Sequence, residues 1–314
     1  MKKFSFIFSL FLLAIILGSC SDGKRADWLK EDDVRVAIDE TFQPIMDEAL
    51  EMFALRHVEA TVYPYYCSED SAIRLLLNDS VLTCVTTRKL NANEEQMLKK
   101  KTLYPTYKII ATDAIALITN KQSGDSLISV DEIRDIALGK ITRWEQLKHS
   151  NRTGDLKLVF DHSGSSTVRF IRDSICGGAQ LKGNLYAQGS NEAVMKIVQE
   201  QDDVIGVIGA NWLRLDTDTN SLATFSHLPY QVMKVSEKSE FVGDYYRPFQ
   251  FYIATGAYPL HRSVYVITID PRTRSQVKEF GAFLTGEPGQ LLICKHSNML
   301  PFSQVFVKRV NVKD

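Results

Sequence analysis

The sequence lacks any marked excess of charge of one sign. Its 314 residues include 37 lysines and arginines against 38 aspartates and glutamates, which leaves a formal net charge of -1. Because non-specific nucleic-acid binding needs a basic surface, this balance argues against nucleic acid as a partner. Glycine and proline, at 17 and 9 residues, are also too few for a collagen-like or low-complexity chain.

Cysteine is scarce and widely spaced. The cysteines form no Cys-x-x-Cys motif and no pairing with histidine, so we expect no metal site and no cofactor. Beyond the N-terminal region they are either buried free thiols or disulfide partners in an oxidising compartment, and the sequence does not choose between these alternatives. These residues are Cys67, Cys84, Cys176 and Cys294.

The chain also lacks an apolar run long enough to be assigned as a membrane-spanning helix. Residues 4–17 form an apolar run of 14 residues behind two lysines, whereas a spanning helix needs about 18–20. Its length and flanks predict a signal peptide at 1–19. Small residues directly before Cys20 resemble a bacterial lipobox and predict lipidation of Cys20, with 20–32 as a tether; the alternative is an ordinary cleaved signal with an incidental cysteine. We therefore expect an extracytoplasmic, lipid-anchored protein on a bacterial membrane, facing the periplasm.

The chain contains enough apolar residues to form a large hydrophobic core. Apolar residues make up 45% of the chain and charged residues 24%, and the length suits two domains or one two-lobed unit. Runs with strand character alternate with runs of helical spacing, which predicts an α/β layer with largely parallel strands. The expected elements of the first part are strands at 34–38, 61–66 and 81–86, and helices at 42–57, 68–77 and from 91.

The rest of the chain continues this alternation without an internal repeat. Ser129 and Glu132 form a capping box at the start of one helix, and Gly139 ends it. An irregular stretch at about 214–245 precedes two short apolar segments at 252–255 and 264–269. The remaining expected elements are strands at 107–119, 156–160 and 204–209, and helices at 129–138, 168–175, 275–284 and 288–296, with another helix opening at Ser190.

A short loop of small hydroxyl residues follows the strand at 156–160. Unpaired N–H groups at a helix start, together with hydroxyl donors, suit a tetrahedral oxyanion, because a buried anion needs many donors at once. The alternative is that Ser165 or Ser166 only caps the helix. The candidate residues are Asp161, Ser163, Gly164, Ser165, Ser166 and Thr167.

Other strand-to-helix junctions carry polar residues as well. In an open α/β sheet, ligands bind beyond the carboxyl ends of the strands, so these junctions can line one crevice. Each residue has a plainer alternative as a helix cap or a solvated surface residue. The candidates are Thr41 and Phe42, Ser68, Thr87 and Arg88, and Ser190 with Asn191.

Sequence signatures of catalysis are missing. His162 and Ser163 are adjacent in the chain, and adjacent residues rarely face each other; no G-x-S-x-G elbow surrounds them. No G-x-x-x-x-G-K-[ST] phosphate loop occurs either. We therefore expect a binding protein rather than an enzyme, with a phosphoryl hydrolase as the remaining catalytic alternative.

Several segments share their order and spacing with one known family. These segments are 113–120, 127–136, 139–144, 163–167, 190–209, 258–260 and 289–290. In this order they resemble the periplasmic phosphate-binding proteins of the phosphate ABC transporter, which have the type II substrate-binding fold. The resemblance covers nearly all of residues 34–302.

The resemblance implies two lobes, each a mainly parallel sheet flanked by helices, joined by two crossover strands with the anion between the lobes. Lobe 1 would comprise 33–115 and 256–314, and lobe 2 would comprise 116–255. The ligand contacts that it implies are Thr41, Phe42, Ser68 and Thr87 from lobe 1, and Ser163, Gly164 and Ser165 from lobe 2, with Ser166 and Thr167 close by.

Two charged residues depart from the family pattern. That pattern has an aspartate in the third loop and an arginine shortly before the Ser-Gly loop, whereas here the third loop has Arg88 and the fourth begins with Asp161. We predict that Arg88 pairs with the oxyanion and that Asp161 accepts the proton of HPO4²⁻, which sulfate lacks. The alternative is that Asp161 caps a turn or pairs with Arg169.

Together these features predict a monomeric solute-binding lipoprotein that captures inorganic phosphate between two lobes and delivers it to an ABC permease. Binding would close the lobes about the crossovers and exclude water. The alternatives are another oxyanion (sulfate, molybdate or tungstate) and a sensor or surface module that keeps the fold without transporting.

Overall fold

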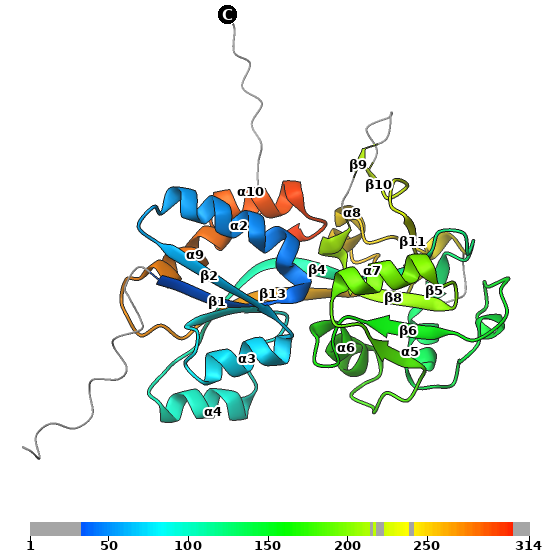
Figure 1. Cartoon of the computed structure of the whole chain (residues 1–314), viewed down its shortest axis with the longest axis horizontal. Coiled ribbons are helices and arrows are strands. Elements are labelled where there is room, and N and C mark those ends of the chain that lie inside the picture. Colours follow the sequence, from blue (N-terminus) through cyan, green and yellow to red (C-terminus); the bar gives the residue numbers. More distant parts are fainter. Residues whose placement is uncertain (1–32, 214–215, 218–222, 239–241, 304–314) are drawn as a thin grey trace, which may run out of the picture.

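A computed structural model describes residues 33–213, 216–217, 223–238 and 242–303 of the chain (Figure 1). The signal peptide, the lipidation site at Cys20 and the tether predicted for 20–32 lie outside the described residues. Within the described ranges, no helix combines the length and the apolar character that crossing a membrane requires.

One mixed sheet runs through both halves of the molecule, and helices cover its two faces (Figure 1). Its strands follow the order β2 (Thr61–Cys67), β1 (Asp33–Asp39), β3 (Thr83–Thr86), β13 (His261–Thr268), β4 (Thr106–Asn120), β8 (Val204–Gly209), β6 (Lys157–Phe160) and β7 (Leu185–Ala187), while β11 (Tyr230–Val232) and β14 (Leu300–Pro301) also pair with β4. Two small sheets pair β5 (Leu127–Ser129) with β12 (Lys234–Ser236), and β9 (Asp216–Thr217) with β10 (Ala223–Thr224).

The strand β4 belongs to both halves. Its first part, Thr106 to Ala114, pairs antiparallel with β13, and residues Ile115 to Thr119 pair antiparallel with β8. The return connection lies beside it, because the buried Tyr258 donates its hydroxyl to the carbonyl of Ile115 at 2.6 Å, and Ile115 N–H donates to the carbonyl of Leu260 at 2.8 Å. The long strand predicted at 107–119 is therefore confirmed.

Three strands are parallel within each half, β2-β1-β3 in one and β8-β6-β7 in the other. β13 is antiparallel to both of its neighbours, so the crossing region adds antiparallel pairs to the expected parallel layers. The predicted two-lobed α/β architecture is confirmed. The exact lobe boundaries, 33–115 with 256–314 and 116–255, stay a prediction.

The helices form one layer on each face of the sheet. In the first half α2, α9 and α10 lie on one side and α3 and α4 on the other, and in the second half α7 lies opposite α5 and α6 (Figure 1). The bounds are α2 (Gln43–Arg56), α3 (Glu69–Leu77), α4 (Ala92–Lys100), α5 (Val130–Ala137), α6 (Ser166–Phe170), α7 (Asn191–Glu200), α8 (Gln250–Ala254), α9 (Gln276–Thr285) and α10 (Glu287–His296). Short turns of helix are η1 (Glu40–Phe42), η2 (Trp144–Gln146), η3 (Ile171–Ile175, π-helical), η4 (Ala210–Trp212) and η5 (Val242–Asp244).

The core follows the apolar pattern of the sequence. Buried apolar side chains form one cluster on each face of the first half of the sheet and one larger cluster in the second half. The capping box of Ser129 and Glu132 is present at the start of α5. The apolar segment at 252–255 lies largely in helix α8. One segment differs from expectation. The helix expected at 168–175 starts at Ser166 and widens into the π-helical turn η3.

The cysteines of the described part of the chain are free thiols. Cys84 and Cys176 are buried, and Cys67 and Cys294 are half-buried. Of the two alternatives that the sequence left open, the free-thiol one therefore holds.

Candidate functional site

Loops from both halves meet where β1 and β8 end. β1 leads through η1, in which Thr41 is fully buried and donates its backbone N–H to Asp39 Oδ1 at 3.0 Å. Gly209 closes β8, and a Cβ added there would lie 2.2 Å from Thr41 Cγ2. Only glycine therefore lets the two loops approach this closely. Asn211 in η4 ties them further by donating Nδ2 to the carbonyl of Thr41 at 3.3 Å.

The hydroxyl loop after β6 is held by its own side chains. Thr167 donates its hydroxyl to Asp161 Oδ1 at 2.7 Å, and Ser165 Oγ lies 2.8 Å from Thr167 Oγ1. Ser165 caps α6 by accepting from the N–H of Val168 at 3.3 Å, and its contact with the ligand stays a prediction. Asp161 is buried and stabilises the loop, while Arg169 pairs with a different carboxylate.

Ser166 connects this loop to the first half and to the crossover strands. Its Oγ lies 3.5 Å from Thr41 Oγ1 and accepts from Arg262 Nη1 at 2.8 Å. Arg262 lies opposite Asp113 in the register of β13 and β4 and donates Nε to Asp113 Oδ2 at 3.0 Å. The side chain of Arg262 is only 3% exposed, and its guanidinium lies 5.7 Å from the centre of the Phe42 ring. Thr41, Ser166 and Arg262 thus form a buried donor cluster drawn from three separate parts of the chain.

Asp39 is the fully buried carboxyl beside this donor cluster. Burial, with a further contribution from the charge of Glu69, raises the pKa of Asp39 to about 7, although Arg262 and the Ser166 hydroxyl act in the opposite direction. Near neutral pH this carboxyl therefore exchanges a proton readily, unlike an exposed aspartate.

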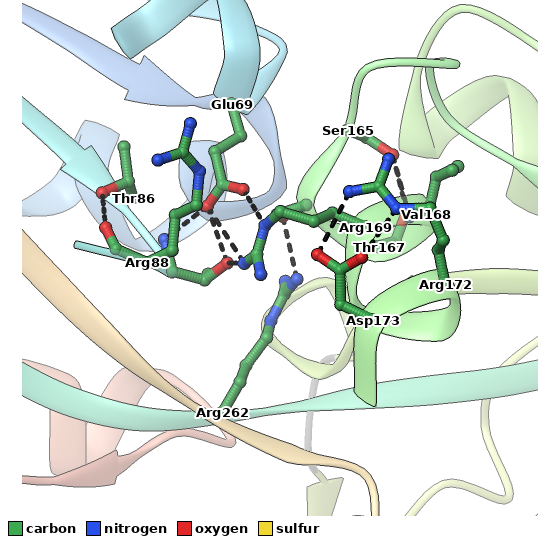
Figure 2. A network of polar contacts seen from close by, with 12 residues as sticks. Glu69, Thr86, Arg88, Ser165, Thr167, Val168, Arg169, Arg172, Asp173 and Arg262 are labelled. Atoms are coloured by element: carbon green, nitrogen blue, oxygen red, sulfur yellow. Dashed lines mark hydrogen bonds and ion pairs between the residues drawn. The ribbon is translucent and has the colours of Figure 1, made fainter. Parts of the chain in front are cut away.

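Glu69 joins the two halves through a second network, which Figure 2 shows from close by. This residue opens α3, is 1% exposed, and accepts both the N–H and the hydroxyl of Thr87 on Oε1, each at 2.7 Å. Its Oε2 accepts from Arg169 Nε of α6 at 2.5 Å, and Arg169 Nη2 donates to Thr87 Oγ1 at 2.6 Å. Burial opposes ionisation of Glu69, but Arg169 and Thr87 outweigh it and lower the pKa of this carboxyl. Glu69 is therefore an ionised carboxylate inside the junction.

A third contact lies at the start of α7. Ser190 caps this helix by accepting from the N–H of Ala193 at 3.1 Å. The next residue, Asn191, donates its N–H and Nδ2 to the two oxygens of Glu40 at 3.1 and 3.0 Å. A carboxylate of the first half thus covers the start of a helix in the second.

The remaining predicted residues are spread around the junction. Arg88 is engaged within its own half, because Nη1 and Nη2 donate to the two oxygens of Glu94 at 2.7 and 2.8 Å. Ser68 and Gly164 face each other across the halves, since a Cβ on Gly164 would lie 3.6 Å from Ser68 Oγ. Ser163 is exposed.

Sequence reasoning missed Asp39, Glu69, Arg169 and Arg262, whereas Asn191 was among its candidates. Arg169 carried a signal, since it lies two residues after the hydroxyl loop, as did Asp39, which ends the first strand. The pairing of Arg262 with Asp113 depends on strand register, which the sequence does not give. Among the described residues, no group of three or more histidine, cysteine or acidic side chains is arranged to hold a metal ion.

A sheet shared by two halves, two adjacent connections and a buried polar junction define a two-lobed ligand-binding protein. The chain belongs to the PBP superfamily domain family, whose model matches residues 25–288. This family assignment agrees with the resemblance described above.

Individual relatives are distant in sequence but cover most of the chain. The phosphate-binding protein PstS of Bacillus subtilis is 22% identical over 291 residues, 93% of this chain and 88% of PstS. Among solved structures, one described as a phosphate ABC transporter substrate-binding protein from Clostridium perfringens with bound phosphate has a TM-score of 0.70 at 18% identity, covering 86% of this chain and all of the other. An ABC-type phosphate transport receptor from Vibrio cholerae has a TM-score of 0.62 at 20% identity, with the same coverage.

Proposed function

We propose that this protein is an extracytoplasmic solute-binding protein that captures inorganic phosphate between its two lobes and delivers it to an ABC permease. The observation that carries the proposal is the buried donor cluster, in which Arg262 Nη1 lies 2.8 Å from Ser166 Oγ and Ser166 Oγ lies 3.5 Å from Thr41 Oγ1. The relatives support it, because those compared above are named for phosphate binding or phosphate transport.

The chemistry of the cluster suits a small tetrahedral anion. A guanidinium and two hydroxyls can replace part of the hydration shell of phosphate, and charge-assisted hydrogen bonds contribute about 1.5–3 kcal/mol each. Asp39, rather than Asp161, is the carboxyl that shares a proton with HPO4²⁻ in this proposal, because its pKa of about 7 allows it either to donate or to accept. A fully ionised sulfate has no proton to share and would face a negative carboxylate.

A panel of anions tests the proposal directly. Isothermal titration of the purified protein with phosphate should give saturable binding, with sulfate, molybdate and tungstate at least tenfold weaker. Tighter binding of one of the other three anions would replace phosphate by that oxyanion. Turnover of a phosphoester at saturation would favour a phosphoryl hydrolase. Tight binding with no effect on phosphate uptake by a permease would favour a sensor.

A further inference from the structure

The carboxylate of Glu69 is held as a bound oxyanion would be held. One of its oxygens accepts a backbone N–H and a hydroxyl from Thr87, and the other accepts the guanidinium of Arg169. These donors come from both halves, since Thr87 follows β3 and Arg169 lies in α6. Thr87 is also one of the residues that the family resemblance assigns to the ligand.

Glu69 and Arg169 are both shielded from solvent, which strengthens the interaction between their charges. The side chain of Glu69 is 1% exposed and that of Arg169 is 18% exposed, so water competes little for either group. Breaking a buried ion pair by removing one partner is costly because the other charge is left uncompensated. Loss of either Glu69 or Arg169 would therefore weaken this contact between the halves.

Glu69 also lies close enough to the donor cluster to act on it. Its negative charge raises the pKa of Asp39, and Asp39 in turn interacts with Ser166 and Arg262. An anion bound at Ser166 and Arg262 would therefore be repelled by the Glu69 carboxylate. The donors of Thr87 and Arg169 are bonded to Glu69 and are therefore not available to that anion.

We propose that Glu69 is an internal anion that occupies part of the oxyanion site, holds the two halves together, and must be displaced for the ligand to bind. The identity of the ligand as phosphate rests on the proposed function. Displacement would release Arg169 and Thr87 to the ligand. Glu69 thereby sets the affinity of the site without contacting the bound anion.

The first experiment measures phosphate affinity in Glu69→Gln. Glutamine keeps the size of the side chain and an acceptor oxygen for Thr87 but removes the charge, so phosphate binding should tighten at least tenfold. Asp203→Asn is the matched control, because it removes a carboxylate that pairs with Lys157 at 2.6 Å on the outside of the second half; its affinity should stay within twofold of the wild type. Unchanged or weaker binding in Glu69→Gln would overturn the proposal.

The second experiment measures compactness by small-angle X-ray scattering in phosphate-free buffer. The wild type should already have the small radius of gyration of the closed form, whereas Glu69→Gln and Arg169→Met should be expanded. Phosphate should contract Glu69→Gln again. A wild type that is expanded without phosphate, or variants as compact as the wild type, would contradict the role of Glu69.

The two proposals fail in different ways. If wild type and Glu69→Gln bind phosphate equally, phosphate binding stands and the internal-anion proposal is wrong. If neither protein binds phosphate, the proposed function is wrong, and the scattering comparison alone decides whether Glu69 holds the halves together.

Discussion

Asp39 is fully buried, and burial is the main reason why its carboxyl keeps a proton to a higher pH than an exposed aspartate does. Burial and Glu69 raise its pKa from an ordinary 3.8 to about 7. Such a group binds its proton more tightly in the folded chain. Its contribution to the free energy of unfolding is therefore present below about pH 4 and is lost as the pH rises through about 7.

The substitution Asp39→Asn removes this dependence. Relative to the wild type, the variant should gain on the order of 2–4 kcal/mol in unfolding free energy between pH 4 and pH 8, since each pKa unit is worth about 1.4 kcal/mol. Urea denaturation at several pH values measures the difference. Parallel stability curves for the two proteins would show that Asp39 is ionised throughout.

Two serines of the hydroxyl loop allow a matched comparison of ligand contacts. Ser166 is buried and accepts from Arg262, whereas Ser163 is exposed. Ser166→Ala should weaken phosphate binding roughly tenfold or more, because a hydrogen bond involving a charged group is worth about 1.5–3 kcal/mol. Ser163→Ala should change affinity less than twofold. Equal losses in calorimetric titrations would mean that the loop turns Ser163 inward when the ligand binds.

At the scale of elements, the end of β8 determines how closely the halves approach. An alanine at Gly209 would place its Cβ 2.2 Å from Thr41 Cγ2, so one of the two loops must move. Gly209→Ala should lower the unfolding free energy by about 1–3 kcal/mol, as overpacking does, and weaken phosphate binding as well. Gly243→Ala is the control, because a Cβ there meets nothing within 4 Å. Equal stability of the two variants in urea denaturation would contradict this packing argument.

Local signals in the sequence predict the elements well and their contacts poorly. The capping box at Ser129 and the long apolar run of β4 depend on neighbouring residues, so both were predictable. The pairing of Glu69 with Arg169 joins residues 100 positions apart and depends on how α3 and α6 face each other. The contact of Arg88 with both oxygens of Glu94 was missed for a different reason. An arginine can pair equally well with a carboxylate or with a bound oxyanion, and we had assigned Arg88 to the oxyanion.

The candidate site shows the same division. Sequence reasoning predicted the loops that meet at the junction, because strand ends in an α/β sheet converge. It named Thr41 and Ser166 but assigned the charged roles to Arg88 and Asp161. The structure pairs Arg88 with Glu94 and keeps Asp161 at the junction, bonded to Thr167, and it adds the charges of Arg169, Arg262 and Asp39 there. Buried charge pairs form across the fold, and no local pattern encodes them.

At the scale of the whole molecule, the N-terminal prediction concerns membrane attachment. If Cys20 is lipidated, the protein expressed in a bacterial host should partition into the detergent phase of a Triton X-114 extraction. Cys20→Ser should move it to the aqueous phase without changing phosphate affinity, because residues 1–32 precede the first strand of the sheet. Aqueous partitioning of the wild type would favour an ordinary cleaved signal.

The strand β4 and the return connection through Tyr258 are bonded to each other where they pass between the halves. Because these hydrogen bonds join the two connections, the connections cannot slide past each other. We therefore expect the halves to open and close about one hinge axis at these connections, with little rotation about the long axis of the molecule. A solute would then enter from a single side, and the face presented to a docking partner would change in one reproducible direction on closure.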